Sequence, residues 1–143
     1  MAEVFGIVGS AAGVIQLTLA AANGIITLIQ DIRDAPEEVL FTRRDVQSLG
    51  AILTSTYDTC VQHNLNTQDQ ALTAALAEYL DMCDQAIKAM HKLLEPLVSK
   101  GLGRRDPRRM IEWTMKKGEV RGLRERINHG KASLTLVISA ING

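Results

Sequence analysis

The first 30 residues of the chain, Met1 to Gln30, contain a single charged side chain, Glu3, among aliphatic, glycine and small polar residues. At 1.5 Å per residue, a helix over Val4 to Ile29 would be about 39 Å long, which exceeds the roughly 30 Å hydrocarbon layer of a bilayer. A chain with such a segment must either bury it against other helices or place it in a membrane.

Three interpretations of this segment compete. A signal peptide is disfavoured because no Lys or Arg precedes Arg33. A permanent transmembrane anchor fits the length, but the polar residues inside the segment and the acidic residues around Arg33 weaken it. A helix mostly buried in a bundle is the favoured resting state. Its polar residues fall near one stripe at helical spacing: Glu3, Ser10, Gln16, Asn23, Thr27 and Gln30.

Small residues recur four positions apart in the same segment. Four of them are glycines that we expect to serve helix packing: Gly6, Gly9, Gly13 and Gly24. Such ridges let two helix backbones approach closely in lipid, and in a soluble bundle they accommodate larger side chains of a neighbour.

The remaining chain is predicted to form further helices. Asp34 as N-cap, with Pro36 and Glu37 after it, opens a second helix that runs to about His63. A third helix is expected over 67–97, kinked or ended by Pro96. A shorter fourth helix begins at Pro107 and continues through Trp113 until Gly118 interrupts it. A final helix covers 119–141.

Apolar residues at helical spacing mark the inward faces of these helices. They are Val39, Val46, Leu49, Leu53 and Cys60 in the second helix, Leu72, Leu76, Tyr79, Leu80, Cys83, Ile87, Met90, Leu94 and Leu97 in the third, and Val120, Leu123, Ile127, Leu134, Val137, Ile138 and Ile141 in the last. Cys60 and Cys83 lack any CxxC spacing, so we expect two buried thiols in a reducing compartment.

Length and composition predict a single all-α domain over 1–143. Aromatic residues make up 3% of the chain and apolar residues 46%, which favours helices over a sheet. The expected architecture is a helical bundle of about five helices, a four-helix-bundle core plus the hydrophobic N-terminal helix. No cap or polar tail follows Ile141, so we expect the domain to be the N-terminal part of a longer protein.

The sequence contains no catalytic or metal-binding motif. GxSxG, GxxxxGK[ST] and HExxH are all missing, and His63, His91 and His129 lie on different predicted helices without acidic or cysteine partners at metal-ligand spacing. We therefore expect neither an enzyme nor a bound metal or cofactor.

Charge is strongly polarised along the chain although its total is zero. Residues 1–99 carry a net −7 and residues 100–143 a net +7. Three interpretations of the basic segment are a solvated face that balances the acidic helices, a docking surface for anionic lipid headgroups and a nucleic-acid surface. No recognition helix or stacking platform accompanies it, so nucleic acid is not the expected partner.

Three segments carry a family resemblance. They are residues 1–17 (MAEVFGIVGSAAGVIQL), 34–38 (DAPEE), and 113–127 (WTMKKGEVRGLRERI) followed by 131–136 (KASLTL). In this order they resemble the fungal HeLo-like domain, found at the N-terminus of fungal NLR-type STAND receptors and in related cell-death effectors. The resemblance covers essentially the whole chain. Its first and last segments are fairly specific, whereas the middle helices match only as an amphipathic pattern.

The resemblance implies a helical bundle akin to HeLo domains and to the four-helix killer domain of mixed-lineage-kinase-like necroptosis effectors, with a membrane-targeting, cytotoxic role. By position, the segment 4–29 would leave the bundle on activation and enter the plasma membrane. The side chains implied to insert are Val4, Phe5, Ile7, Val8, Val14, Ile15, Leu17, Leu19, Ile25, Ile26, Leu28 and Ile29.

The same resemblance implies that the basic segment docks on anionic phospholipids. The residues concerned are Arg104, Arg105, Arg108, Arg109, Lys116, Lys117, Arg121, Arg124 and Trp113. The domain would be cytoplasmic at rest and would homo-oligomerise at the plasma membrane. Its trigger, an amyloid-signalling or NLR partner, would lie outside 1–143. The alternative is a non-lytic helical protein-interaction module of an NLR-like receptor.

Overall fold

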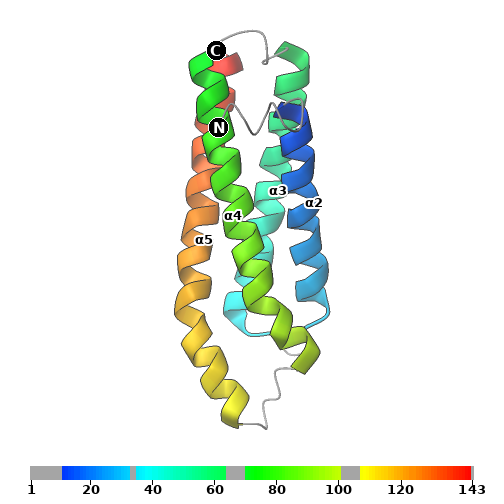
Figure 1. Ribbon diagram of the computed structural model, residues 1–143, viewed down its shortest axis with the longest axis vertical. Helices are drawn as coiled ribbons and strands as arrows, with labels where there is room; N and C mark the ends of the chain where they lie inside the picture. Colours follow the sequence, from blue (N-terminus) through cyan, green and yellow to red (C-terminus); the bar gives the residue numbers. More distant parts are fainter. Residues whose placement is uncertain (1–10, 33–34, 64–69, 101–106, 143) are drawn as a thin grey trace.

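Four long helices make up the described chain in a computed structural model (Figure 1). They are α2 (Ala11–Gln30), α3 (Glu37–His63), α4 (Gln70–Lys100) and α5 (Pro107–Asn142). The structure describes residues 11–32, 35–63, 70–100 and 107–142, with side chains at 12–32, 35–62, 71–96 and 111–142. No strand occurs in these ranges, so the predicted all-α class is confirmed.

The helices lie side by side, and each packs against two neighbours. α2 packs on α3 and α4, and α5 packs on the same two helices from the opposite corner. The colours of Figure 1 show that consecutive helices run in opposite directions, so α2 is parallel to α4 and α3 is parallel to α5. This arrangement directs one face of every helix toward a common core.

The predicted inward stripes form that core. All five stripe residues of α3 are buried, as are Leu76, Leu80, Cys83, Ile87, Met90 and Leu94 of α4 and Val120, Ile127, Leu134 and Val137 of α5. Leu72, Tyr79, Leu123, Ile138 and Ile141 are partly buried, and the side chain of Leu97 lies outside the described part. Apolar spacing therefore located the core correctly in three helices.

The described residues form four helices, where about five were expected for the chain. α5 is one helix of 36 residues that passes through Gly118 without a break, so the predicted fourth and fifth helices are one. A glycine inside a helix costs only about 1 kcal/mol relative to alanine, and full burial of Val120 and Ile127 on the same helix outweighs that cost. The hydrophobic N-terminal helix is also not an addition to a four-helix core, because α2 is itself one of the four.

Two expected helix boundaries also differ. α4 continues past Pro96 to Lys100, so this proline does not end the helix. At the start of α3, the backbone N–H of Leu40 donates to the carbonyl of Pro36 at 3.1 Å, which gives Pro36 the N-cap position expected of Asp34. Asp34 itself lies outside the described residues.

Cys60 and Cys83 are both free and buried, as predicted. Burial raises the pKa of the Cys60 thiol to about 11 and that of the Cys83 thiol to about 12, so both are uncharged at neutral pH. Gly130 of α5 faces Cys83 across the α4–α5 contact, and a Cβ at Gly130 would overlap the Cys83 Sγ. The two helices therefore approach closely because this position lacks a side chain.

We expect Gly130→Ala to lower the free energy of unfolding by about 1–3 kcal/mol, because the added methyl overpacks the α4–α5 contact. Gly118→Ala is the matched control. A Cβ there meets nothing within 4 Å, so the substitution should stabilise the chain by about 0.5–1 kcal/mol through helix propensity. Urea unfolding measures both, and adding Cys83→Ala should relieve part of the Gly130→Ala loss. Equal stability of the two alanine variants would contradict the close approach.

Candidate membrane-acting site

α2 is the helix of the described chain that is long and apolar enough to cross a membrane. Its window Ala12–Gln30 has a mean hydropathy of 1.8, and 33% of that window is buried inside the bundle. Core helices of soluble proteins meet the same criteria, so the surroundings of α2 define its resting role. The inward side chains are Val14, Ile15, Thr18, Ala22, Ile25 and Ile29.

The outward face of α2 carries no charge. Its exposed residues are Gln16, Leu17, Ala20, Asn23, Gly24, Thr27 and Gln30. The predicted polar stripe is therefore on the solvent side at Gln16, Asn23, Thr27 and Gln30, while Glu3 and Ser10 lie outside the described residues. Leu17, with 60% of its surface exposed, interrupts this stripe with a large apolar side chain.

α2 contains no Asp, Glu, Lys, Arg or His, so its side chains contribute no ion pair to the bundle. Two of its hydroxyl groups bond within the helix: Thr18 Oγ1 donates to the Val14 carbonyl at 3.0 Å, and Thr27 Oγ1 donates to the Asn23 carbonyl at 3.1 Å. These bonds go with the helix wherever it moves. α2 can therefore leave its neighbours without leaving a charge unpaired.

The structure places the residues predicted to insert on several sides of α2. Val14, Ile15, Ile25 and Ile29 are buried in the core, and Leu19, Ile26 and Leu28 pack against it from the edges. Leu17 faces outward. Val4, Phe5, Ile7 and Val8 lie outside the described residues, as does the expected start of the helix at Val4.

Of the predicted packing glycines, the structure describes Gly13 and Gly24. A Cβ at Gly24 would meet nothing within 4 Å, so no described helix packs closely on Gly24. Gly13 is partly buried, and Gly6 and Gly9 lie outside the described residues.

The predicted headgroup-binding residues do not form one free basic face. Arg121 and Arg124 are joined to acidic residues of α3. Trp113 is partly buried and packs against the core, and Lys116 and Lys117 are also partly buried. Arg104 and Arg105 lie outside the described residues, and Arg108 and Arg109 belong to the first turn of α5, where side chains are not described.

The acidic and basic residues instead build an ion-pair network between α3 and α5. Arg121 donates to Glu38 Oε1 from Nη2 at 2.8 Å and from Nε at 3.0 Å. Arg124 donates to Glu38 Oε2 at 3.1 Å and to Asp45 Oδ2 at 2.8 Å. The amide of Asn128 also donates to Asp45, at 3.3 Å. Both carboxylates are thus shared between donors of α5.

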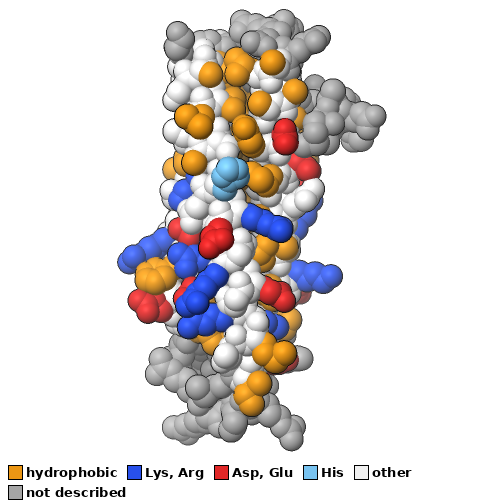
Figure 2. Space-filling view, turned by 90° about the vertical axis from the view of Figure 1, so that its left-hand side faces the viewer, with side chains coloured by type: hydrophobic (Ala, Val, Ile, Leu, Met, Phe, Trp, Pro, Cys, Tyr) orange, Lys and Arg blue, Asp and Glu red, His pale blue; other side chains and the backbone are white. Residues whose placement is uncertain are grey.

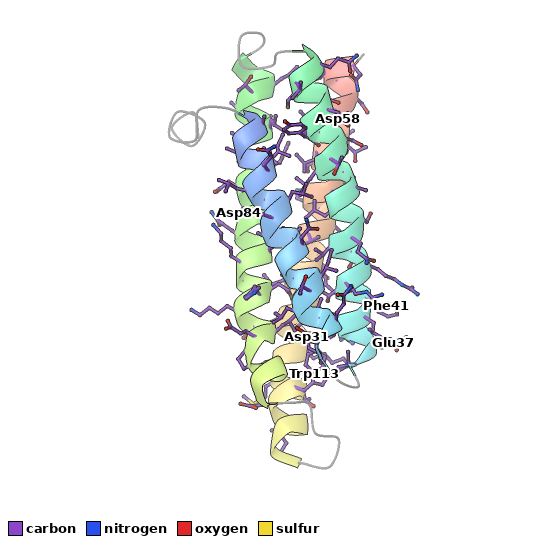
Figure 3. The ribbon with its side chains drawn as sticks, turned by 90° about the vertical axis from the view of Figure 1, so that its right-hand side faces the viewer. Asp31, Glu37, Phe41, Asp58, Asp84 and Trp113 are labelled. Atoms are coloured by element: carbon purple, nitrogen blue, oxygen red, sulfur yellow. The ribbon has the colours of Figure 1, made fainter. Side chains whose placement is uncertain are left out.

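Phe41 lies beneath this network. The Arg124 guanidinium carbon is 5.3 Å from its ring centroid, and that of Arg44 is 5.9 Å away, within reach of cation–π attraction. Figure 3 shows Phe41 and Glu37 in the first turns of α3, at the same end of the bundle as Asp31 and Trp113.

The spacing of the charged residues indicates this network, although the expectation of one basic surface overlooked it. Glu38 and Asp45 are seven residues apart on one helix, and Arg121, Arg124 and Asn128 have spacings of three and four on another. Each set therefore forms a stripe on one face of its helix. Pairing the two stripes required knowing that α3 and α5 are neighbours.

The network shifts the titration of its members. A hydrogen bond from Arg121, and then the charges of Arg121, Arg124 and Lys117, hold the pKa of Glu38 below its ordinary value of 4.5 despite the opposing effect of desolvation. The same hydrogen bond raises the pKa of Arg121. The charged forms of both groups are therefore stabilised by folding.

Some exposed apolar side chains lie away from the charges, whereas Ile111 and Met115 are exposed beside charged residues. Figure 2 shows charged groups over the middle of the face formed by α5 and its neighbours, with mostly apolar and uncharged side chains above them. Residues 132–142 of α5 are uncharged, and Leu136 there is 72% exposed. Val61 at the end of α3 is 59% exposed. Sequence spacing identified the buried stripe of α5 but not these outward residues.

Among the described side chains, no three His, Cys, Asp or Glu residues come together to hold a metal ion. No protein-family model, curated protein or solved structure matches this chain.

We expect Glu38→Gln to destabilise the fold at neutral pH, because Arg121 and Arg124 lose their shared carboxylate. Glu38 has a lowered pKa when folded, so its contribution is present above its ordinary pKa of 4.5 and disappears as the pH falls through the lower folded value. The difference between variant and wild type in urea unfolding should thus shrink between pH 7 and pH 3. Glu78→Gln, at an exposed position of α4, is the control. A Glu38→Gln effect independent of pH would contradict the ionic role.

Proposed function

We propose that this domain permeabilises membranes as the executioner of a cell-death response, and that α2 and the residues before it insert after oligomerisation. One observation carries the proposal: α2 is uncharged and long enough to span a membrane, whereas ion pairs hold α3 and α5 together. The proposal includes membership of the HeLo-like family, a cytoplasmic resting state and action at the plasma membrane.

The energetics of α2 favour two locations for this helix, the bundle core and a bilayer. Burial of a large aliphatic side chain such as Ile15, Ile25 or Ile29 is worth roughly 1.5–3 kcal/mol, so α2 does not leave for water. A bilayer offers these side chains another apolar environment, and the backbone of α2 stays hydrogen-bonded within the helix there. Insertion therefore replaces one burial with another.

Departure of α2 uncovers the faces of α3 and α4 on which it packed. Leu80 of α4 and Gly50 of α3 lie beside α2, and the apolar surface that its departure uncovers must be buried again. Homo-oligomerisation supplies the matching apolar surface from other copies. We propose that an amyloid-signalling or NLR partner outside residues 1–143 provides the required local concentration.

Docking before insertion is proposed to use the basic residues that the α3–α5 network leaves available. Lys116 and Lys117 make no ion pair with a described residue, and Arg104, Arg105, Arg108 and Arg109 precede them in the chain. Anionic lipids attract such residues by around 1 kcal/mol each. We assign Arg121 and Arg124 to holding the bundle together, with lipid contact secondary.

A second candidate function is a non-lytic protein-interaction module. Leu136 and Val61, both more than half exposed near the uncharged end of α5, favour it. In that case α2 stays in the bundle, and apolar pairing with a partner would change little with added salt, unlike docking through the basic residues.

Release of a trapped dye from anionic vesicles tests the proposal, with the chain clustered through a C-terminal coiled-coil fusion. The test variant is Ala20→Asp with Asn23→Asp, because both positions are exposed in the bundle and lie near the middle of the span. Each charge at the centre of a membrane helix costs roughly 3 kcal/mol. We expect an unchanged melting temperature and loss of dye release.

The control variant is Gln47→Asp with Ser48→Asp, at exposed positions of α3, and it should release dye like the wild type. Undiminished release by the α2 variant would exclude insertion of this helix. Failure of the clustered wild type to bind or permeabilise vesicles would favour the interaction module. Substitutions on the exposed face are preferable to deletion of residues 1–30, which would remove one of the four core helices.

A further inference from the structure

A groove of about 600 Å³ lies between α4 and α5, and none of the residues of the α3–α5 ion-pair network lines it. This volume lies within the roughly 300–1,000 Å³ typical of small-molecule sites. Its lining residues are Ala89, Lys92, Leu93, Lys116, Glu119, Gly122, Leu123 and Arg126.

The groove combines an apolar floor with a basic rim. Leu93 and Leu123 are partly buried and pack against the core. Lys92, Lys116 and Arg126 supply three positive charges, against one negative charge from Glu119. Among the ion pairs between described residues, none uses these three cations. The electrostatics favour an anion, and the floor favours an alkyl chain attached to it.

Gly122 keeps the groove open. A Cβ at this position would meet nothing within 4 Å, so no helix contact requires a glycine there. A glycine inside a helix lowers helix stability by about 1 kcal/mol relative to alanine. Gly122 lines the groove, and Ala89 on the facing helix is the other small residue of the lining.

We propose that this groove binds one long-chain fatty-acid anion, with its alkyl chain along Leu93 and Leu123 and its carboxylate at the part of the basic rim that Lys92 and Lys116 form. Lys116 and Arg126 are ten residues apart on α5, a rise of about 15 Å, so the groove is elongated like an extended chain. A lipid that stays in a bilayer offers only its headgroup and leaves the apolar floor uncovered. The inference does not require insertion of α2, although Lys116 is shared with the proposed docking residues.

Isothermal titration with dodecanoate, kept below its micelle-forming concentration, tests the site on the full chain. We expect saturable binding of one molecule per chain. Acetate, which lacks the alkyl chain, and dodecyltrimethylammonium, which reverses the charge, should each bind at least about 10-fold more weakly. Equal binding of the cationic and anionic amphiphiles, or association only with vesicles, would overturn the proposal.

The decisive variant is Gly122→Leu, which fills the groove at a position where the bundle has free space. It should weaken dodecanoate binding at least about 10-fold without lowering the melting temperature. Gly118→Leu is the matched control, since a Cβ there also meets nothing within 4 Å but the residue does not line the groove. Equal affinities of the two leucine variants would refute the site.

A charge variant makes the test independent of filling the groove. Lys92→Gln with Lys116→Gln removes two cations of the rim, each worth up to about 1 kcal/mol or 5-fold in affinity. Lys131→Gln, on α5 outside the lining, should leave the affinity unchanged. A dodecanoate affinity that is the same in the double variant and the wild type would exclude the basic rim as the carboxylate site.

Discussion

The bundle depends on covering α2 through apolar contact alone. Ala11–Gln30 contains no ionisable side chain, so no ion pair can orient the helix or fix its register. Its position is set by Ile15, Ile25 and Ile29 fitting between α3 and α4. Apolar burial is strong but non-directional. It therefore keeps α2 in the bundle when the domain is in water, and it would equally stabilise α2 in another apolar environment.

The opposite corner of the bundle is held differently. Glu38 and Asp45 of α3 bind the guanidinium groups of Arg121 and Arg124 of α5, and these directional contacts specify one alignment of the two helices. The Arg121 side chain is 58% exposed, so the network contributes more to alignment than to stability. A change in which α2 departs would leave α3 and α5 paired, since their connection involves no residue of α2.

Much of the fold could be predicted from the sequence, because the buried residues of α3, α4 and α5 repeat at helical spacing. This spacing can be read within each helix without knowing its neighbours. The continuity of α5 could not be predicted, since Gly118 weakens a helix locally while the burial of Val120 and Ile127, a tertiary effect, keeps it continuous. The partners of Arg121 and Arg124 are separated from them by about 80 residues, so charge counting placed these arginines with the free basic residues. The α4–α5 groove depends on the same kind of information, because Lys92 and Lys116 lie on different helices.

The stability of the resting bundle sets a requirement on whatever activates it. For a population to move from 1:99 to 99:1 in favour of the inserted state, the activating interaction must favour that state by roughly 5.5 kcal/mol. Docking through basic residues such as Lys116 and Lys117 brings the domain to an anionic surface, but it shifts no population where it favours both states equally. In the proposed mechanism, other copies of the chain cover the surfaces of α3 and α4 that α2 leaves, so assembly and insertion are coupled by the same apolar surface. The proposal thus implies that a single copy remains in its bundle even at a membrane and that clustering controls the change.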